Sequence, residues 1–165
     1  MAILDGKKVS NDIKNEITAE VNKMKERGEK VPHLAAIIVG NDGASLTYVN
    51  SKVKACERVG FESTMVRMPS TTSELELLSK IKELNENDDI DGFIVQLPLP
   101  PQIDTQEVLM TVNPDKDVDG FHPTNFGKMA LDMSTFIPAT PFGILELLER
   151  YNVDTQGKHT VVIGR

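Results

Sequence analysis

The apolar residues of this chain form short unbroken runs that alternate with segments of helical spacing. The runs at residues 33–40, 61–68 and 91–97 are typical of buried strands. Between and beside them, apolar residues recur every three or four positions, which predicts helices over residues 7–27, 45–60, 104–112 and 140–151, and one that begins at 70–73. This alternation predicts an α/β fold with three layers, α/β/α, around a mostly parallel sheet.

Local signals refine these elements. We expect the helix after Ser73 to bury Leu75, Leu78, Ile81 and Leu84, and Thr140-Pro141 to supply the N-cap and first residue of the last helix. Residues 113–127 are predicted to be a loop, and HTVVIG, residues 159–164, a final strand.

Lys52 occupies an unusual position on the helix expected at residues 45–60. At about 100° per residue it falls roughly 40° from Tyr48, inside the arc that holds Val59 and Cys56. An ammonium buried without a partner gives up its proton readily, which suits an acid–base group. The alternative is a lysine whose stem packs while its head reaches water. The helix alone favours this second explanation.

Other candidates lie where strands end. Gln96 interrupts an apolar strand, so its amide must find hydrogen-bond partners, either in a site, where its carbonyl could accept from an ammonium, or in a nearby loop. Parallel sheets bind ligands at this edge. Asp115, Asp117 and Asp119 have the alternate spacing of a calcium loop but lack its glycine and distal glutamate, so we expect no metal.

Two other features of the sequence have simpler explanations than a role in catalysis. His122 is expected to be a loop or capping residue, because no Ser, Cys or second His is placed to work with it. The prolines of residues 98–101 predict a rigid wall or turn, and whether one of these bonds is cis stays open.

The composition of the chain limits the classes of binding partner that we expect. The chain has 165 residues and a net charge of −7 spread along its length, which argues against nucleic acid and anionic membranes. No apolar run is long enough to span a bilayer and no signal peptide precedes the first helix, so a cytoplasmic protein is expected. The single cysteine, Cys56, is expected to be a small core residue.

Taken together, several segments resemble one family. These are YVNSKVKACERVGF, GFIVQLPLP, NPDKDVDGFHPTNFGKM, FIPATPFGILELL and GKHTVVIGR. They are similar, in this order, to motifs of the bifunctional methylenetetrahydrofolate dehydrogenase/methenyltetrahydrofolate cyclohydrolases. The resemblance implies NADP-dependent (in some members NAD-dependent) oxidation of 5,10-methylenetetrahydrofolate, hydrolysis of the product to 10-formyltetrahydrofolate, a tetrahydrofolate substrate that feeds purine biosynthesis, and a homodimer.

The resemblance also implies roles for individual residues. Lys52, Tyr48 and Gln96 match the catalytic positions, and Asp119 matches the pterin-binding aspartate. Val95, Leu97 and Pro98 lie in the matching substrate-binding stretch, and Gly164 and Arg165 match the start of the nucleotide-binding turn. Other readings stay open: a two-domain α/β dehydrogenase of another substrate, or a folate-binding or dimerisation fragment without catalysis.

The end of the chain predicts a truncated second domain. VVIGR begins a dinucleotide-binding turn that nothing continues, and the matching serine is missing. We therefore expect residues 1–139 to form a folate-binding catalytic domain, residues 140–158 a linking helix, and residues 159–165 the first strand of a Rossmann domain. We expect no dehydrogenase activity from this chain alone.

Overall fold

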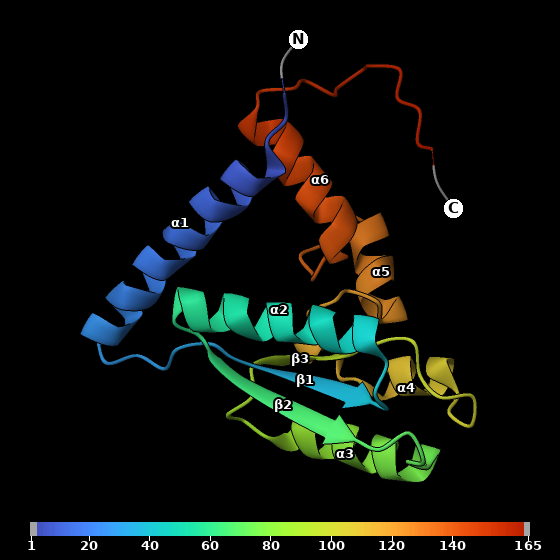
Figure 1. Cartoon of the computed structure of the whole chain (residues 1–165). Coiled ribbons are helices and arrows are strands. Elements are labelled where there is room, and N and C mark those ends of the chain that lie inside the picture. The colour runs from blue at the N-terminus through green and yellow to red at the C-terminus, as the bar shows by residue number, and fades with distance from the viewer. Residues whose placement is uncertain (1–2, 164–165) are drawn as a thin grey trace.

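The computed structural model describes residues 3–163 of the chain (Figure 1). Helices and strands alternate over most of its length. In chain order they are α1 (Gly6–Glu26), β1 (His33–Val39), α2 (Gly43–Val59), β2 (Glu62–Met68), α3 (Glu74–Glu86), β3 (Gly92–Val95), α4 (Thr105–Thr111), the 3₁₀ turn η1 (Pro114–Lys116), α5 (Pro123–Ala130) and α6 (Ala139–Arg150).

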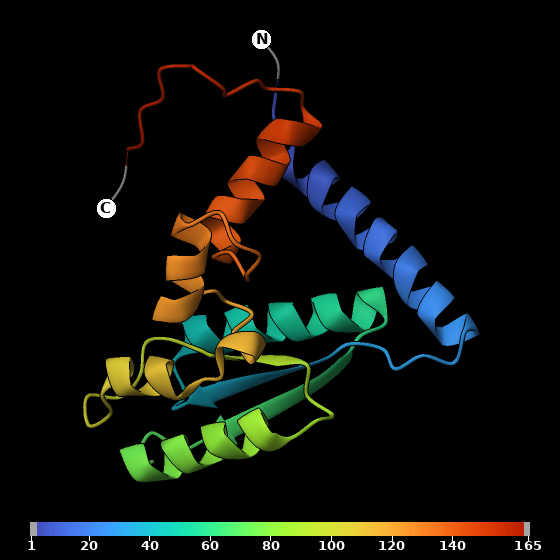
Figure 2. The same ribbon diagram turned by 180° about the vertical axis from the view of Figure 1, so that it is seen from behind.

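The three strands form a parallel sheet in the order β2-β1-β3. Helix α2 covers one face, and α3 and α4 lie on the other, as the two opposite views show (Figure 2). Alternate residues of β1 point into two separate cores: Ile37 packs with α3 and α4, and Ile38 packs with α2. The predicted three-layer α/β fold with a parallel sheet is confirmed.

Helix α2 has clear signals at both ends. The Asp42 carboxylate accepts a hydrogen bond of 2.8 Å from the Ser45 amide, which satisfies a free N–H of the first turn and lowers the pKa of Asp42. Gly60 ends the helix in the left-handed conformation with φ 86°, a geometry that glycine adopts without strain. The helix predicted around Lys52 and its stop at Gly60 are therefore confirmed.

The predicted inner face of α3 is wrong at one residue. Ser73 caps the helix as expected, but Leu75 is 78% exposed, whereas Leu77 is fully buried. The buried stripe is centred on Leu77, Ile81 and Leu84, and Leu75 falls about 120° from Ile81 around the helix.

Residues 113–127 are more regular than the predicted loop. They contain η1 and the start of α5, and α5 begins with Pro123 at a position where its missing N–H costs nothing. His122 is the N-cap of α5, and its Nδ1 accepts from the Thr124 amide at 3.1 Å. The expected capping role of His122 is confirmed.

The last helix begins earlier than predicted. Pro138 is the N-cap of α6 and makes no side-chain capping bond, so Thr140 lies inside the first turn and is not the cap. Helix α6 leans away from the sheet and meets α1 near the N-terminal end of the chain (Figure 1). Arg150 makes two bonds of 2.7 Å to the Glu16 carboxylate, which hold the pKa of Glu16 below its ordinary value.

The strand predicted at residues 159–164 is also wrong. Residues 159–163 belong to no helix or strand, and Val162 and Ile163 are 89% and 96% exposed. A strand needs a neighbour for its backbone hydrogen bonds, and within residues 3–163 none lies beside this segment. Residue 164 falls outside the described residues. Among residues 3–163, no helix is both long and apolar enough to cross a lipid bilayer.

Candidate active site at the carboxyl ends of the strands

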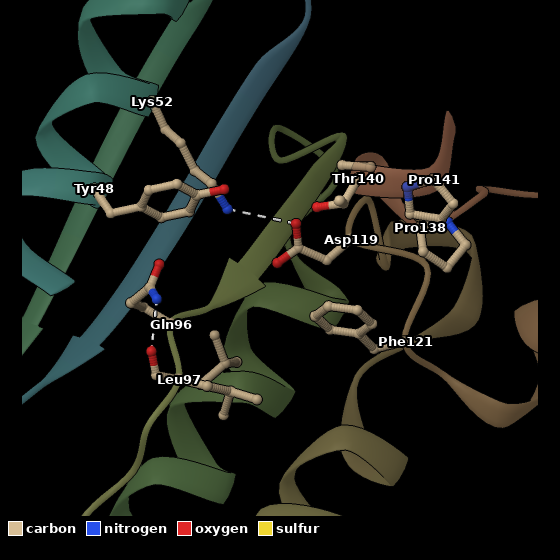
Figure 3. A pocket seen from close by; sticks show the side chains of 11 residues that line it. Tyr48, Lys52, Gln96, Leu97, Asp119, Phe121, Pro138, Thr140 and Pro141 are labelled. Atoms are coloured by element: carbon tan, nitrogen blue, oxygen red, sulfur yellow. Dashed lines mark hydrogen bonds and ion pairs between the residues drawn. The ribbon is translucent and has the colours of Figure 1, made fainter. Parts of the chain in front are cut away.

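A cavity of about 220 Å³ opens beside the carboxyl end of β3. It is lined by residues from α2, from the segment after β3, from the turn at Asp119 and from the start of α6 (Figure 3). Six predicted site residues line it: Tyr48, Lys52, Val95, Gln96, Leu97 and Asp119. The structure thus brings together side chains that lie as far as 71 positions apart, from Tyr48 to Asp119.

Lys52 is paired. Its Nζ lies 3.4 Å from Oδ1 of Asp119 and 4.8 Å from the centre of the Tyr48 ring. The Lys52 and Asp119 side chains are 32% and 23% exposed. The ammonium therefore lies between a carboxylate and an aromatic face, both of which attract a cation.

Gln96 lies directly after β3 and is fixed by backbone and side chain. Its backbone N–H donates to the Ile37 carbonyl at 2.9 Å, and its side-chain Nε2 donates to the Leu97 carbonyl at 2.6 Å. The expected bond from the Lys52 ammonium to the Gln96 carbonyl is absent from residues 3–163, because the ammonium faces Asp119 instead. Figure 3 shows the Gln96 oxygen turned toward the side of the cavity that holds Tyr48 and Lys52.

The turn that carries Asp119 is held by a buried polar network around Asp117. The Asp117 carboxylate is 5% exposed and accepts from the His122 amide at 2.8 Å and from Asn125 Nδ2 at 3.0 Å. The Asp117 carbonyl also accepts from the Gly120 amide at 3.2 Å. The Asp117 carboxylate is thus held inside the protein by these bonds. Asp119, in contrast, lines the cavity with its carboxylate.

Gly120 brings the Asp119 turn against the start of α6. Its φ is +69°, and a Cβ there would lie 2.8 Å from Pro138 N and 2.9 Å from both Ile137 C and Phe136 O. Only glycine permits this approach. Residues 136–138 therefore pack on the turn, and the first turn of α6 becomes a wall of the cavity.

Some lining residues were not among the predicted site residues. These are Phe121, Pro138, Ala139, Thr140 and Pro141. The Thr140-Pro141 helix signal marked part of this wall, but no sequence pattern ties it to the Asp119 turn. Pro98, in contrast, was predicted as a site residue; it is exposed, does not line the cavity, and follows a cis Leu97–Pro98 bond. Gly164 and Arg165 lie outside the described residues.

A larger cavity, about 700 Å³, lies between α1, α2 and α6. Most of its lining side chains are apolar, among them Ile13, Val59, Phe61 and Phe142. Cys56 also lines it, and burial raises the pKa of its thiol. Lys14 and Glu146 also line it, but among the described residues no ion pair joins them, in contrast to Lys52 and Asp119 in the smaller cavity.

Fold and cavity define a class: a parallel α/β domain with a charged site at the carboxyl edge of its sheet, as in many α/β enzymes. Residues 4–119 match the model of one family, described as tetrahydrofolate dehydrogenase/cyclohydrolase, catalytic domain. The chain belongs to this family, as its motifs predicted.

Curated relatives agree over the full chain. The bifunctional protein FolD of Flavobacterium psychrophilum is 84% identical over 165 residues, and that of Bacteroides thetaiotaomicron is 56% identical over the same length. The chain spans 56% of the length of each.

Solved structures share the fold. The bifunctional FolD enzyme of Campylobacter jejuni superposes with a TM-score of 0.92 at 43% identity, over 96% of this chain and 56% of that one. The Trypanosoma brucei FolD, solved with NADP cofactor and an inhibitor, gives a TM-score of 0.90 at 34% identity, over 95% of this chain and 54% of that one.

Proposed function

We propose that this chain provides the folate-binding, acid–base half of a bifunctional enzyme of one-carbon metabolism. The whole enzyme would oxidise 5,10-methylenetetrahydrofolate with NADP and hydrolyse the resulting 5,10-methenyltetrahydrofolate to 10-formyltetrahydrofolate. The observation that carries this proposal is the convergence of Lys52, Asp119, Tyr48 and Gln96 on one cavity. Family membership supports the same reaction.

Lys52 is the acid–base group of the hydrolytic step in this proposal. The methenyl carbon lies between two nitrogens and carries positive charge, so water adds to it and must lose a proton. Neutral Lys52 would accept that proton and pass it to the pteridine ring nitrogen as its bond to the carbon breaks, leaving the formyl group on the other nitrogen. A positioned proton carrier of this kind contributes about 10²–10⁴-fold to a rate.

Asp119 and Tyr48 hold the substrate. A carboxylate accepts from two adjacent donors, which matches the amino group and ring N–H of a pterin. The Tyr48 side chain is exposed at the rim of the cavity, where its ring can stack on the pteridine. A cavity of about 220 Å³ suits this ring, while the rest of the folate extends into solvent.

The residues proposed to begin the binding turn of the cofactor, Gly164 and Arg165, lie outside the described range. NADP is supported by the Trypanosoma brucei relative, which binds it. We propose that its site belongs to a second domain starting at residue 159, after a catalytic domain of residues 1–139 and a linker of residues 140–158.

Partners and location follow from the same proposal. The substrate is a tetrahydrofolate derivative and the product supports purine biosynthesis; the enzyme works as a homodimer in the cytoplasm. The negative charge of the chain supports the absence of a nucleic-acid partner.

A second candidate is a folate-binding module without hydride transfer. The observation that favours it is that the side chains converging on the cavity are those proposed to hold the folate and to carry a proton. Folate binding with no NADP-dependent absorbance change is the expected behaviour of this chain.

The test uses a chimera in which these 165 residues replace the matching segment of the Flavobacterium psychrophilum relative. Lys52→Met should lower cyclohydrolase turnover by at least about 100-fold while substantial dehydrogenase activity remains. Lys54→Met is the matched control, because Lys54 is exposed on the same helix, and should change neither activity. Near-normal cyclohydrolase turnover in Lys52→Met would refute the acid–base role.

A further inference from the structure

The cavity contains two possible hydrogen-bond acceptors for the Lys52 ammonium. One is the Asp119 carboxylate, which holds it in the present structure. The other is the Gln96 side-chain oxygen. Because the Leu97 carbonyl can only accept, the Gln96 nitrogen must face it, and the oxygen is left pointing into the cavity.

The existing pair is easily broken. A Nζ–Oδ1 distance of 3.4 Å is long for a charge-assisted hydrogen bond, which is usually about 2.7–2.9 Å. Both side chains are partly exposed, so solvent screens their attraction. Within residues 3–163, Asp119 is the single acceptor that the ammonium contacts, and a flexible four-carbon stem allows the ammonium to turn elsewhere.

The second acceptor is unused. Among residues 3–163, no donor reaches the Gln96 side-chain oxygen, although Gln96 and Lys52 line the same cavity. A cavity-facing amide oxygen held in place from its nitrogen side is a ready hydrogen-bond acceptor. The site thus contains one mobile amine and two alternative acceptors for it.

We propose that Asp119 is the resting partner of Lys52, and that substrate binding transfers Lys52 from Asp119 to Gln96. This inference rests on the proposed function. The donor edge of the pterin takes over the Asp119 carboxylate, so the ammonium loses its counter-ion. It then donates to the Gln96 oxygen, next to the reacting carbon.

The transfer changes the chemistry of Lys52 at the moment when substrate arrives. A carboxylate stabilises the ammonium, whereas a neutral amide stabilises it less and a cationic methenyl group repels it. Substrate recognition at Asp119 therefore releases Lys52 for proton transfer. In the free protein the same pair holds the Lys52 amine at Asp119.

This exchange predicts an unusual effect on affinity, measured by calorimetric titration of the 165-residue chain with 5-formyltetrahydrofolate, whose pteridine carries no positive charge. Lys52→Met removes the competitor for Asp119, so binding should tighten about two- to fivefold, the size of a screened ion pair. If Lys52 instead holds the ligand directly, the same substitution should weaken binding. Lys54→Met should leave the affinity unchanged.

The background of Asp119→Asn separates the possible failures. Asp119→Asn alone should weaken binding by about 10-fold or more, through loss of a charge-assisted acceptor, and adding Lys52→Met should then bring no tightening. If the unsubstituted chain binds no folate, or Asp119→Asn binds normally, the folate assignment itself fails. If Asp119→Asn weakens binding but Lys52→Met does not tighten it, only the partner exchange is overturned. Thermal unfolding of each variant confirms that it folds.

Discussion

The Lys52 Nζ lies 3.4 Å from the Asp119 Oδ1, across a cavity formed by α2 and the turn after η1. This pairing decides how the half-buried lysine is accommodated, because its charge is met by a carboxylate from a segment 67 positions away. The ammonium is neither unpartnered nor released to bulk water. Two roles of Lys52 are compatible with this pair: a fixed positive charge, or a proton carrier.

The substitution Lys52→Arg distinguishes these two roles in the chimera with the Flavobacterium psychrophilum relative. Arginine keeps the positive charge and can still pair with Asp119, but it does not give up its proton in proteins. We expect cyclohydrolase turnover to fall by at least about 100-fold, as in Lys52→Met. Turnover within about threefold of the unsubstituted chimera would mean that charge alone suffices.

Periodicity and strand ends located much of this site in advance, because they are local properties. The helical position of Lys52 follows from 3.6 residues per turn, and the position of Gln96 follows from the end of an apolar run. The partner of Lys52 could not be derived in this way. Whether its ammonium meets Gln96 or Asp119 depends on side-chain geometry that no spacing encodes.

The wall formed by Phe121 and the start of α6 was missed for a related reason. It depends on a backbone contact between Gly120 and residues 136–138, which are remote in sequence and carry no paired pattern. The error at Leu75 is of another kind: Leu77, Ile81 and Leu84 share one arc at 3.6 residues per turn, so the period itself favours Leu77 over Leu75.

Gly120→Ala should destabilise the protein by about 2–4 kcal/mol, because it combines left-handed backbone strain with a backbone clash at Pro138. Gly28→Ala is a matched control: its φ is also +69°, but its Cβ would meet nothing within 4 Å. Strain alone should cost about 1–2 kcal/mol there. Urea unfolding measures both, and equal losses would show that the contact with residues 136–138 contributes nothing.

The Asp117–Asn125 pair provides a test of the network that aims Asp119. Asn125→Asp replaces a donor with a second buried carboxylate beside Asp117, so we expect a loss of about 2–4 kcal/mol at pH 7. The loss should shrink at pH 4.5, where one of the two carboxyls can take a proton. Denaturant unfolding at both pH values checks this.

Adding Asp117→Asn to Asn125→Asp should restore part of the lost stability. One carboxylate then remains, and the new amide can donate to it. If the double variant is less stable than Asn125→Asp alone, the repulsion between two carboxylates is not the cause of the loss.

Asp91 connects the start of β1 to the turn before β3 through hydrogen bonds. We therefore expect the free energy of unfolding to depend on pH in the acidic range. Its carboxylate accepts from Lys30 Nζ at 2.9 Å and from the His33 amide at 2.8 Å. Partial burial acts to raise the pKa of Asp91, but these two donors outweigh it and hold the pKa below its ordinary value. The bonded carboxylate is therefore favoured in the folded state.

The sign of the pH effect follows from this lowered pKa. The stabilisation is fully present above the unfolded value, about 3.9, and is lost as the pH falls through the lower folded value. Asp91→Asn should therefore reduce stability at pH 6 by less than about 1 kcal/mol, because the Lys30 pair is screened, and the difference should shrink as the pH falls below the unfolded value. Asp88→Asn, at an exposed neighbour, should show little change at either pH. A difference for Asp91→Asn that grows as the pH falls would contradict the lowered pKa.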